Sequence, residues 1–411
     1  MNRYDVIVVG SGAAGMIAAI QAGRDGKKVL LLEKLSKLGS KLKATGGGRC
    51  NLTNTLNNEE FMAKFGRNGR FMQDALHLLD HNALIEFFNG IGVETHAPDG
   101  FRVFPVGHNS QTILTALEDE LNRLHVDIKT SQKVTELLSE ELHVSGVKTD
   151  TDIYHAPNVI IATGGLGYPT LGAEGDGYTL ASSLGHKTTE LFPAMMPLIT
   201  KENWGTNCRA DTLAKVELRV DIKKYKNLKA VGDLIFTKNG IRGPVVLDFA
   251  REITPILSKL GEVPIIANLT KGMNEDDILR HFKNEILKDP DANIEQNLLS
   301  ILPSSVIREL CKLADVDPSM KFNKVEGKNR AELVKILAST PLTITGHEGF
   351  KMAMITRGGI SLKEIDPRTM QSKLIKGLYF CGEVMDLDGP CGGYNLQWSF
   401  ASGYLAGHLL D

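Results

Sequence analysis

The start of the chain carries two kinds of hydrophobic pattern. Residues 4–9 and 28–32 are nearly continuous apolar runs, and the small, apolar residues 13–24 lie between them with helical periodicity. Continuous apolar runs are typical of strands in a parallel sheet that is covered on both faces. The pattern therefore predicts a strand–helix–strand unit.

The next segments continue this alternation. Helical periodicity recurs at residues 71–90 and 111–124, and residues 159–162 form another short apolar run that ends in Thr163 and Gly164. A short apolar run followed by glycine is typical of a buried strand. We expect this segment to return to the sheet that the first strands begin.

The pattern changes from about residue 193. Short apolar runs bounded by turn residues lie at 216–220, 233–236 and 263–267. Helical periodicity follows at 276–287, 304–314 and 329–337. These patterns predict a β-rich insertion followed by a helical lobe.

Residues 377–411 return to strand, glycine loop and helix, so the first domain is expected to be discontinuous. The expected fold is α/β, with a Rossmann-like dinucleotide-binding domain, a β-rich insert and a small helical insert. The expected boundaries are 1–192 with 342–411 for the first domain, 193–272 with 323–341 for the β-rich insert, and 273–322 for the helical insert.

A glycine turn follows the first strand. In Gly10-Ser11-Gly12-Ala13-Ala14-Gly15 the first glycine allows a tight turn, the second lets the backbone approach a pyrophosphate, and the third allows close helix packing. Glu33 ends the next strand, where a carboxylate can accept hydrogen bonds from both ribose hydroxyls of an adenosine. A 2′-phosphate at this point would be repelled by Glu33. The spacing predicts a bound dinucleotide without a 2′-phosphate.

The C-terminal part favours FAD over NAD. A ribityl chain needs an acceptor near a strand end, and Gly382-Glu383 could supply it. The glycine loop at 389–395 precedes the helix at 396–410, whose N-terminus could stabilise the negative charge of a reduced flavin. The simpler interpretation is a surface glycine turn that caps a terminal helix.

Composition narrows the partners. The formal net charge is −2 and 42% of the residues are hydrophobic, which favours a small-molecule substrate over nucleic acid or an anionic membrane. The five cysteines are scattered and include no CxxC pair, so neither a disulfide framework nor a metal site is expected. With no apolar signal segment behind a basic start, we expect a cytoplasmic, soluble protein. The oligomeric state stays open.

Several motifs together carry a resemblance. They are DVIVVGSGAAG at 5–15, TGGGRCNLTN at 45–54, ATGG at 162–165, GDG at 175–177, FTKNGIRGP at 236–244, TRGG at 356–359 and GPCGGYNLQW at 389–398. With them the chain resembles, from end to end, the bacterial flavoprotein family that includes bile-acid 4,6-reductase-like and aminoacetone-oxidase-like enzymes. The resemblance implies a glutathione-reductase-type FAD domain interrupted by a β-barrel and a helical insert. Arg242 departs from the pattern, because relatives usually carry serine there.

The resemblance also implies the cofactor contacts. Pyrophosphate contacts would be Gly10, Ser11, Gly12, Ala13, Ala14 and Gly15, and Glu33 and Lys34 would contact the adenosine ribose. The loop along FAD would supply Lys43, Thr45, Gly46, Gly47, Gly48, Arg49, Cys50 and Asn51. The remaining contacts would be Thr163, Gly164, Gly382, Glu383, Asp388, Gly393, Tyr394, Asn395, Leu396 and Gln397.

The catalytic group is harder to predict, because the flavin itself carries the hydride and the protein need supply only orientation, charge and a proton. Tyr394, beside the predicted flavin helix, is the best candidate proton donor, ahead of Tyr168 and His347. Cys391 could act as a thiolate in the same loop, whereas Cys50 is expected to be a small packed residue.

Three functions fit these patterns. The leading one is an FAD-dependent oxidoreductase that transfers a hydride between flavin N5 and a small organic substrate, with NADH or NADPH as a transient reductant. The second is a flavin oxidase that passes electrons from an amine-type substrate to dioxygen. The third, of another class, is a binding or RNA-associated protein that uses FAD as a structural element.

Overall fold

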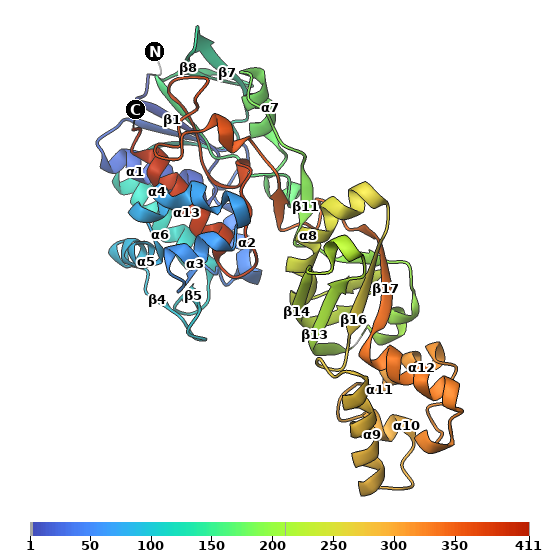
Figure 1. Ribbon diagram of the computed structural model, residues 1–411. Helices are drawn as coiled ribbons and strands as arrows, with labels where there is room; N and C mark the ends of the chain where they lie inside the picture. The colour runs from blue at the N-terminus through green and yellow to red at the C-terminus, as the bar shows by residue number, and fades with distance from the viewer. Residues whose placement is uncertain (1–2, 210, 411) are drawn as a thin grey trace. The chain divides into compact units, whose positions relative to one another are not determined.

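The computed structural model describes residues 3–209 and 211–410. The chain divides into two compact units, shown as ribbons in Figure 1. Unit 1 comprises Met1–Pro193 and Met354–Asp411, and unit 2 comprises Ala194–Ala353. Unit 1 is therefore discontinuous in sequence, as the return of the strand and glycine pattern near the C-terminus indicates.

Unit 1 is built on a sheet of five parallel strands in the order β19-β10-β1-β2-β6. The strands are β1 (Val6–Val9), β2 (Val29–Leu32), β6 (Asp127–Lys129), β10 (Asn158–Ile161) and β19 (Leu378–Phe380). Every residue of β1 and β2 is buried, which explains their continuous apolar runs. The last strand of the chain thus completes the sheet that the first strand begins.

Two helices of small residues pack closely in unit 1. α1 (Ala13–Arg24) follows β1, and α13 (Tyr394–Gly407) lies beside it in Figure 1. A Cβ added to Gly403 would lie 2.2 Å from the carbonyl oxygen of Ala14, so only glycine allows this approach. The other helices are α2 (Ser40–Ala44), α3 (Asn58–Ala63), α4 (Gln73–Leu78), α5 (His81–Gly90), α6 (Ser110–Arg123) and α7 (Asp176–Ser183).

Smaller sheets complete this part of the chain. They are β3 (Thr53–Asn54) with β5 (Arg102–Pro105) and β4 (Thr95–His96), β7 (Val134–Glu140) with β8 (His143–Thr149) and β9 (Ile153–His155), and β11 (Phe192–Ala194) with β18 (Ile355–Arg357). The helix predicted over 71–90 is in fact α4 and α5, because Asp80 leaves the helical conformation and caps α5 by accepting a hydrogen bond from the Ala83 amide.

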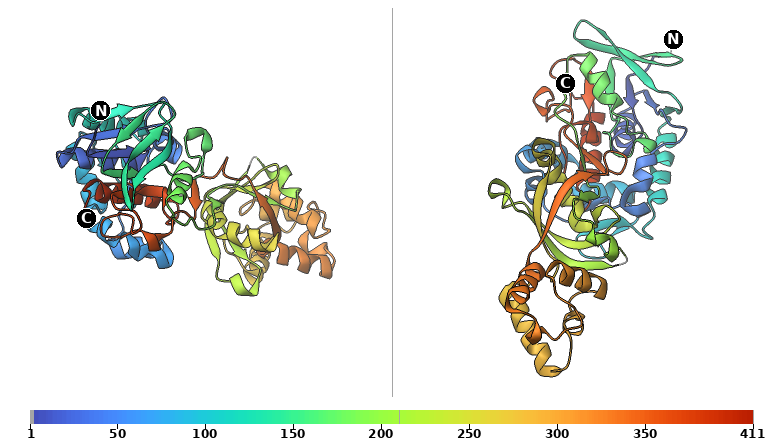
Figure 2. Two further views of the ribbon diagram at one scale, coloured as in Figure 1. Left: turned by 90° about the horizontal axis from the view of Figure 1, so that it is seen from above. Right: turned by 90° about the vertical axis from the view of Figure 1, so that its right-hand side faces the viewer.

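Unit 2 contains a closed barrel of six strands in the order β12-β15-β14-β13-β16-β17. The strands are β12 (Leu198–Thr200), β13 (Thr212–Val220), β14 (Lys229–Phe236), β15 (Gly240–Arg242), β16 (Val263–Asn268) and β17 (Thr340–His347). The helices of the unit are α8 (Pro244–Leu260), α9 (Glu275–Lys288), α10 (Ile294–Leu298), α11 (Ser304–Leu313) and α12 (Gly327–Ala338). Figure 2 shows helices α9 to α12 gathered at one end of the barrel.

The observed architecture confirms the predicted fold class, a Rossmann-type domain with a β-barrel and helices. The boundary expected before residue 342 differs from the structure, because it falls inside β17. Residues 340–344 of that strand pair with β16, which keeps the whole strand in the barrel. None of the helices that the structure describes is both long and apolar enough to cross a membrane.

Candidate functional site

A deep cleft lies in unit 1 over the carboxyl ends of its parallel strands. It contains about 1330 Å³ free of protein atoms, including its open mouth, and Val9, Leu32, Ala162 and Cys381 line it at or just beyond the ends of β1, β2, β10 and β19. Ligands of open α/β sheets bind at this edge, outside the carboxyl ends of the strands. The fold therefore places the N-terminal and C-terminal motifs around one cavity.

The glycine turn forms one wall of the cleft. Gly10 has a φ of +100°, and a Cβ on Gly15 would lie 1.8 Å from the Gly10 carbonyl oxygen, so both positions require glycine. A Cβ on Gly12 would instead meet no atom within 4 Å. Within the described part of the chain, no side chain caps the N-terminus of α1. The first amides of α1 are thus available to an anion at a positive helix end.

Glu33 lies just after β2 and lines the cleft. Its Oε2 accepts hydrogen bonds from the Ser11 amide, at 3.0 Å, and the Ser11 hydroxyl, at 2.6 Å, and its Oε1 accepts one from the Leu35 amide at 2.8 Å. A carboxylate offers about four acceptor sites, so one remains for a ribose hydroxyl. Glu33 can accept hydrogen bonds from both ribose hydroxyls only if the Ser11 hydroxyl turns away from it.

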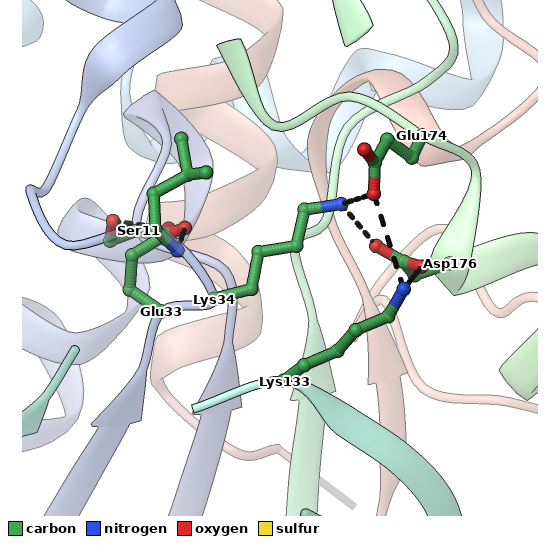
Figure 3. Close-up of polar contacts among 7 residues, drawn as sticks. Ser11, Glu33, Lys34, Lys133, Glu174 and Asp176 are labelled. Atoms are coloured by element: carbon green, nitrogen blue, oxygen red, sulfur yellow. Dashed lines mark hydrogen bonds and ion pairs between the residues drawn. The ribbon is translucent and has the colours of Figure 1, made fainter. Parts of the chain in front are cut away.

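Lys34 belongs to a cluster of four charged side chains beside Glu33 (Figure 3). Its Nζ lies 2.8 Å from Glu174 Oε2 and also contacts Asp176, while Lys133 Nζ lies 3.1 Å from Asp176 Oδ1. Burial would raise the pKa of Asp176, but the hydrogen bonds from Lys34 and Lys133 lower it below its usual value. The two lysines are held in place by the two acids at this end of the cleft.

Glu383 stands on the other side of the cleft, directly after β19. Lys41 Nζ lies 2.7 Å from its Oε2, and its Oε1 accepts a hydrogen bond from the Thr356 amide at 2.9 Å. Both side chains are mostly buried, with exposed fractions of 24% for Lys41 and 19% for Glu383. Lys41 therefore compensates a carboxylate that would otherwise repel an anionic cofactor.

Most of the predicted cofactor contacts line this cleft. They are Gly10, Ser11, Gly12, Ala13, Ala14, Glu33, Lys34, Thr45, Thr163, Gly164, Gly382, Glu383, Asp388, Asn395 and Leu396. Asn395 also fixes the loop before α13, because its side chain accepts from the Gly389 amide at 2.8 Å and donates to the Gly389 carbonyl at 2.9 Å.

Another group of predicted contacts does not line the cleft: Gly15, Lys43, Gly46, Gly47, Gly48, Arg49, Cys50, Asn51, Gly393, Tyr394 and Gln397. In the loop at 45–51, Arg49 is exposed and donates to the Gly46 carbonyl at 3.1 Å. Cys50 is buried, and burial raises the pKa of its thiol to about 11. The side-chain oxygen of Asn51 accepts a hydrogen bond from the backbone amide of Gly393, which joins this loop to the start of α13. The loop supports the site more than it forms its surface.

The candidate proton donors also fall outside the cleft lining. Tyr394 is 4% exposed, and its ring packs against Phe61 at 5.0 Å and Phe65 at 6.2 Å between ring centres, which favours a packing role. Tyr168 lies in a loop of the same unit, and His347 lies on β17 of unit 2. Burial lowers the pKa of His347. The structure therefore gives no support to Tyr394 as a catalytic group.

Other residues that line the cleft were not predicted. They include Lys41, Gln132, Lys133, Leu171, Gly172, Asp176, Thr356, Trp398 and Ser399. Asp176 and Thr356 lie in the GDG and TRGG motifs, so the sequence did carry a signal for them. No motif singled out Lys41 or Lys133.

These features fit FAD. The space beside Gly12 suits close approach of a pyrophosphate, and the uncapped start of α1 suits its charge. The Thr163 hydroxyl, which belongs to the lining, is buried with no hydrogen-bond partner among the described residues and could donate to a bound group. The glycine turn, the acid after β2 and the cleft across the sheet define a Rossmann-type dinucleotide-binding protein.

Comparison with known proteins takes this further. The family model described as the HI0933-like protein Rossmann domain matches residues 4–409, so the chain belongs to the HI0933-like family. It is 32% identical to the 3-dehydro-bile acid delta(4,6)-reductase of Clostridium scindens, over 99% of this chain and 98% of that one. It is 29% identical to the ribosomal RNA dihydrouridine synthase of Escherichia coli, over 98% and 97% of the two chains.

A solved structure shares the fold over the same length. The 3-ketosteroid delta1-dehydrogenase of Sterolibacterium denitrificans aligns with a TM-score of 0.54 at 15% identity, covering 100% of this chain and 99% of that one. Together these findings confirm the resemblance to bile-acid-reductase-like flavoproteins. The chain is an FAD-dependent oxidoreductase.

The expectation that the protein does not bind nucleic acid is weakened. It relied on the net charge of the whole chain, and the name of a full-length relative includes ribosomal RNA. Residues 209–242 of unit 2 hold nine Lys or Arg and four Asp or Glu, so a near-neutral total hides a basic segment. Net charge is evidence about partners only when its distribution is also considered.

Proposed function

We propose that this protein is an FAD-dependent reductase that uses NADH or NADPH to saturate a carbon–carbon double bond conjugated to a carbonyl group. The observation that carries the proposal is the cleft, which both ends of the chain line with the features that fit FAD. The names of the full-length relatives support the reaction type. One is a reductase of a 3-dehydro-bile acid, and the other makes dihydrouridine, the form of uridine saturated next to a carbonyl.

In this proposal, the residues of the chain bind and orient the cofactor. FAD, when bound, supplies the hydride transfer. Gly12 and the first amides of α1 hold the pyrophosphate, and Glu33 accepts a hydrogen bond from the ribose. Glu383, compensated by Lys41, accepts hydrogen bonds from the ribityl chain. The N-terminus of α13, where Asn395 fixes the preceding loop, would stabilise negative charge on the reduced cofactor.

The first experiment is an anaerobic visible spectrum of the FAD-reconstituted protein before and after NADH or NADPH. Bleaching of the oxidised flavin band within seconds is expected. Reoxidation by a conjugated enone, but not by its saturated analogue, would then identify the acceptor type. A spectrum that neither nucleotide changes but that an amine substrate bleaches would contradict the proposal and favour the oxidase.

A second candidate is that the double bond lies in a uracil base of RNA. Two full-length relatives carry the name ribosomal RNA dihydrouridine synthase, the second of them from Haemophilus influenzae at 28% identity over 98% of both chains. The basic segment of unit 2 provides an independent reason to consider RNA. Mass spectrometry of ribosomal RNA incubated with the protein, FAD and NADPH would show a gain of two hydrogens per modified uridine. No gain, together with turnover of an enone, would favour the small-molecule substrate.

A further inference from the structure

The positive charge of unit 2 is concentrated on one hairpin of the barrel. Strands β13 and β14 and the turn between them carry Arg219, Lys223, Lys224, Lys226 and Lys229, which we call the basic hairpin. All five residues are exposed, and the one acid between them in sequence is Asp221. The helical lobe of the same unit, at 275–321, has more acidic than basic residues. The excess charge is therefore local.

The cations of the basic hairpin have no acidic partners among the residues that the structure describes. Within residues 3–209 and 211–410, no ion pair involves any of the five, whereas other exposed lysines of unit 2 do pair, such as Lys201 with Glu262 at 3.5 Å and Lys312 with Glu309 at 2.7 Å. The ammonium of Lys224 lies 5.3 Å from the ring centre of Tyr225, which is a contact with an aromatic face. These charges remain available to an external anion.

One pair of residues in the basic hairpin destabilises the fold when no anionic partner is bound. Arg219 on β13 lies directly opposite Lys229 on β14. Residues directly opposite each other in an antiparallel pair have their side chains on the same face, where like charges destabilise the sheet. The next pair on the same face is Glu217 with Val231, and the Val231 side chain is 63% exposed. A polyanion bound across the two strands would relieve the repulsion.

We propose that the basic hairpin is a binding surface for the phosphate backbone of RNA. The inference rests on the second candidate under the proposed function and deepens it by placing the contact with RNA on the barrel. The five cations follow one another around the turn end of the hairpin, from near the end of β13 to the first residue of β14, so they can contact successive phosphates of one backbone. Such phosphate contacts supply affinity and position the RNA but carry no sequence information.

The test measures binding without turnover. Fluorescence anisotropy of a labelled ribosomal RNA stem–loop is followed with the FAD-loaded protein over a range of salt concentrations. We compare the triple variant Lys223→Ala, Lys224→Ala and Lys226→Ala with a matched triple on exposed lysines of the same unit, Lys283→Ala, Lys324→Ala and Lys328→Ala. Flavin content and melting temperature verify that both variants fold.

The hairpin triple is expected to bind the RNA roughly 10-fold more weakly or worse, and to lose about 2 from the slope of log affinity against log salt, while the control triple stays at the wild-type values. Equal losses in the two triples, or none in either, would overturn the proposal. Stronger binding to phosphatidylserine vesicles than to RNA would overturn it as well. Enone reduction by both triples at the wild-type rate would show that the reductase proposal stands even where the hairpin proposal fails.

Discussion

The two units treat their positive charges in opposite ways. In the cleft of unit 1, the three lysines that line the surface all face carboxylates: Lys34 and Lys133 face Glu174 and Asp176, and Lys41 faces Glu383. On the basic hairpin of unit 2, no cation has an acidic partner among the described residues, and Arg219 faces Lys229. The cleft thus holds its charges in fixed positions, whereas the hairpin leaves them to the solvent or to a partner.

This difference separates two kinds of anion binding. In the cleft, backbone amides and uncapped helix ends provide the positive potential, and the paired lysines keep acids such as Glu383 from repelling a dinucleotide. On the hairpin, no described acid pairs with the cations, so binding of a polyanion would release mobile counterions and depend on salt. Changes to the cleft should therefore alter cofactor retention, and changes to the hairpin should alter RNA binding without altering cofactor retention.

The largest expected effect comes from the glycine turn. Gly15→Ala places a Cβ 1.8 Å from the Gly10 carbonyl oxygen, so we expect a loss of at least about 1–3 kcal/mol in the free energy of unfolding, together with loss of FAD. Gly12→Ala is the matched control for folding, because its Cβ meets no protein atom within 4 Å. It should melt like the wild type without FAD and bind FAD roughly 10- to 100-fold more weakly.

Calorimetry of the FAD-free proteins and a flavin titration check both outcomes. If Gly12→Ala retained FAD at wild-type affinity, the pyrophosphate would not approach this turn, and the placement of FAD in the cleft would be wrong.

The second effect concerns the pair of Lys41 and Glu383. Lys41→Ala leaves a mostly buried carboxylate without its partner, at a cost between that of an exposed pair and that of a fully buried one, about 1–3 kcal/mol. We expect FAD affinity to fall roughly 5- to 100-fold. Lys37→Ala, an exposed lysine outside the cleft lining, should leave affinity unchanged.

The double variant Lys41→Ala with Glu383→Gln distinguishes charge compensation from direct contact. Because the neutral amide no longer repels the cofactor, part of the lost affinity should return. Additive losses in the double variant would mean that Lys41 and Glu383 contact FAD independently.

The units also differ in how far the sequence predicted them. The helix expected over 13–24 is α1 itself, because its small residues allow helix and strand to approach and its glycine turn fixes where it begins. In unit 2, helix α8 was not predicted, since Pro255 lies inside it and proline usually ends a helical pattern. Tertiary packing against the barrel outweighs that local preference.

The candidate site was predictable where a backbone motif marks it and not where charges meet through the fold. Gly10, Gly12 and Glu33 follow from spacing along the chain. Lys41 lies far from Glu383 in sequence and belongs to no motif, so only the fold brings the two together. The basic hairpin was hidden for another reason, because a net charge of −2 averages over acidic and basic regions.

A smaller effect should appear in the acid stability of unit 1. Glu120 on α6 binds Arg123 at 2.6 Å and Arg24 of α1 at 2.7 Å. The pKa of Glu120 is lowered from 4.5 to about 2, mainly by the hydrogen bond from Arg123. Burial opposes this shift, and Arg24 adds to it. A carboxyl with a lowered pKa stabilises the fold above its unfolded pKa, and this stability is lost as the pH falls from about 4.5 to about 2.

Glu120→Gln should therefore reduce the free energy of unfolding by about 1–2 kcal/mol at pH 7, with a smaller difference as the pH approaches 3. The matched control is Glu118→Gln on the same helix, where burial and then Asp119 raise the pKa of the carboxyl, so removing its charge should cost nothing at pH 7. Urea unfolding at several pH values measures both. A pH-independent loss for Glu120→Gln would indicate a packing role rather than paired charges.

The smallest effect is also the most direct test of the comparison between the units. Lys229→Glu places an acid opposite Arg219 and converts a repulsive cross-strand pair into an attractive one, so we expect a gain of about 0.2–1 kcal/mol in the free energy of unfolding. Lys238→Glu, at an exposed lysine with no cation opposite it in the strand pairing, is the control and should change stability little. Lys229→Glu should at the same time weaken RNA binding.

Higher stability with lower affinity would mean that the like-charged pair is kept for a partner at the expense of the fold, in contrast to the paired lysines of the cleft. A loss of stability in Lys229→Glu would instead show that Lys229 holds the hairpin together, and the contrast between the two units would disappear.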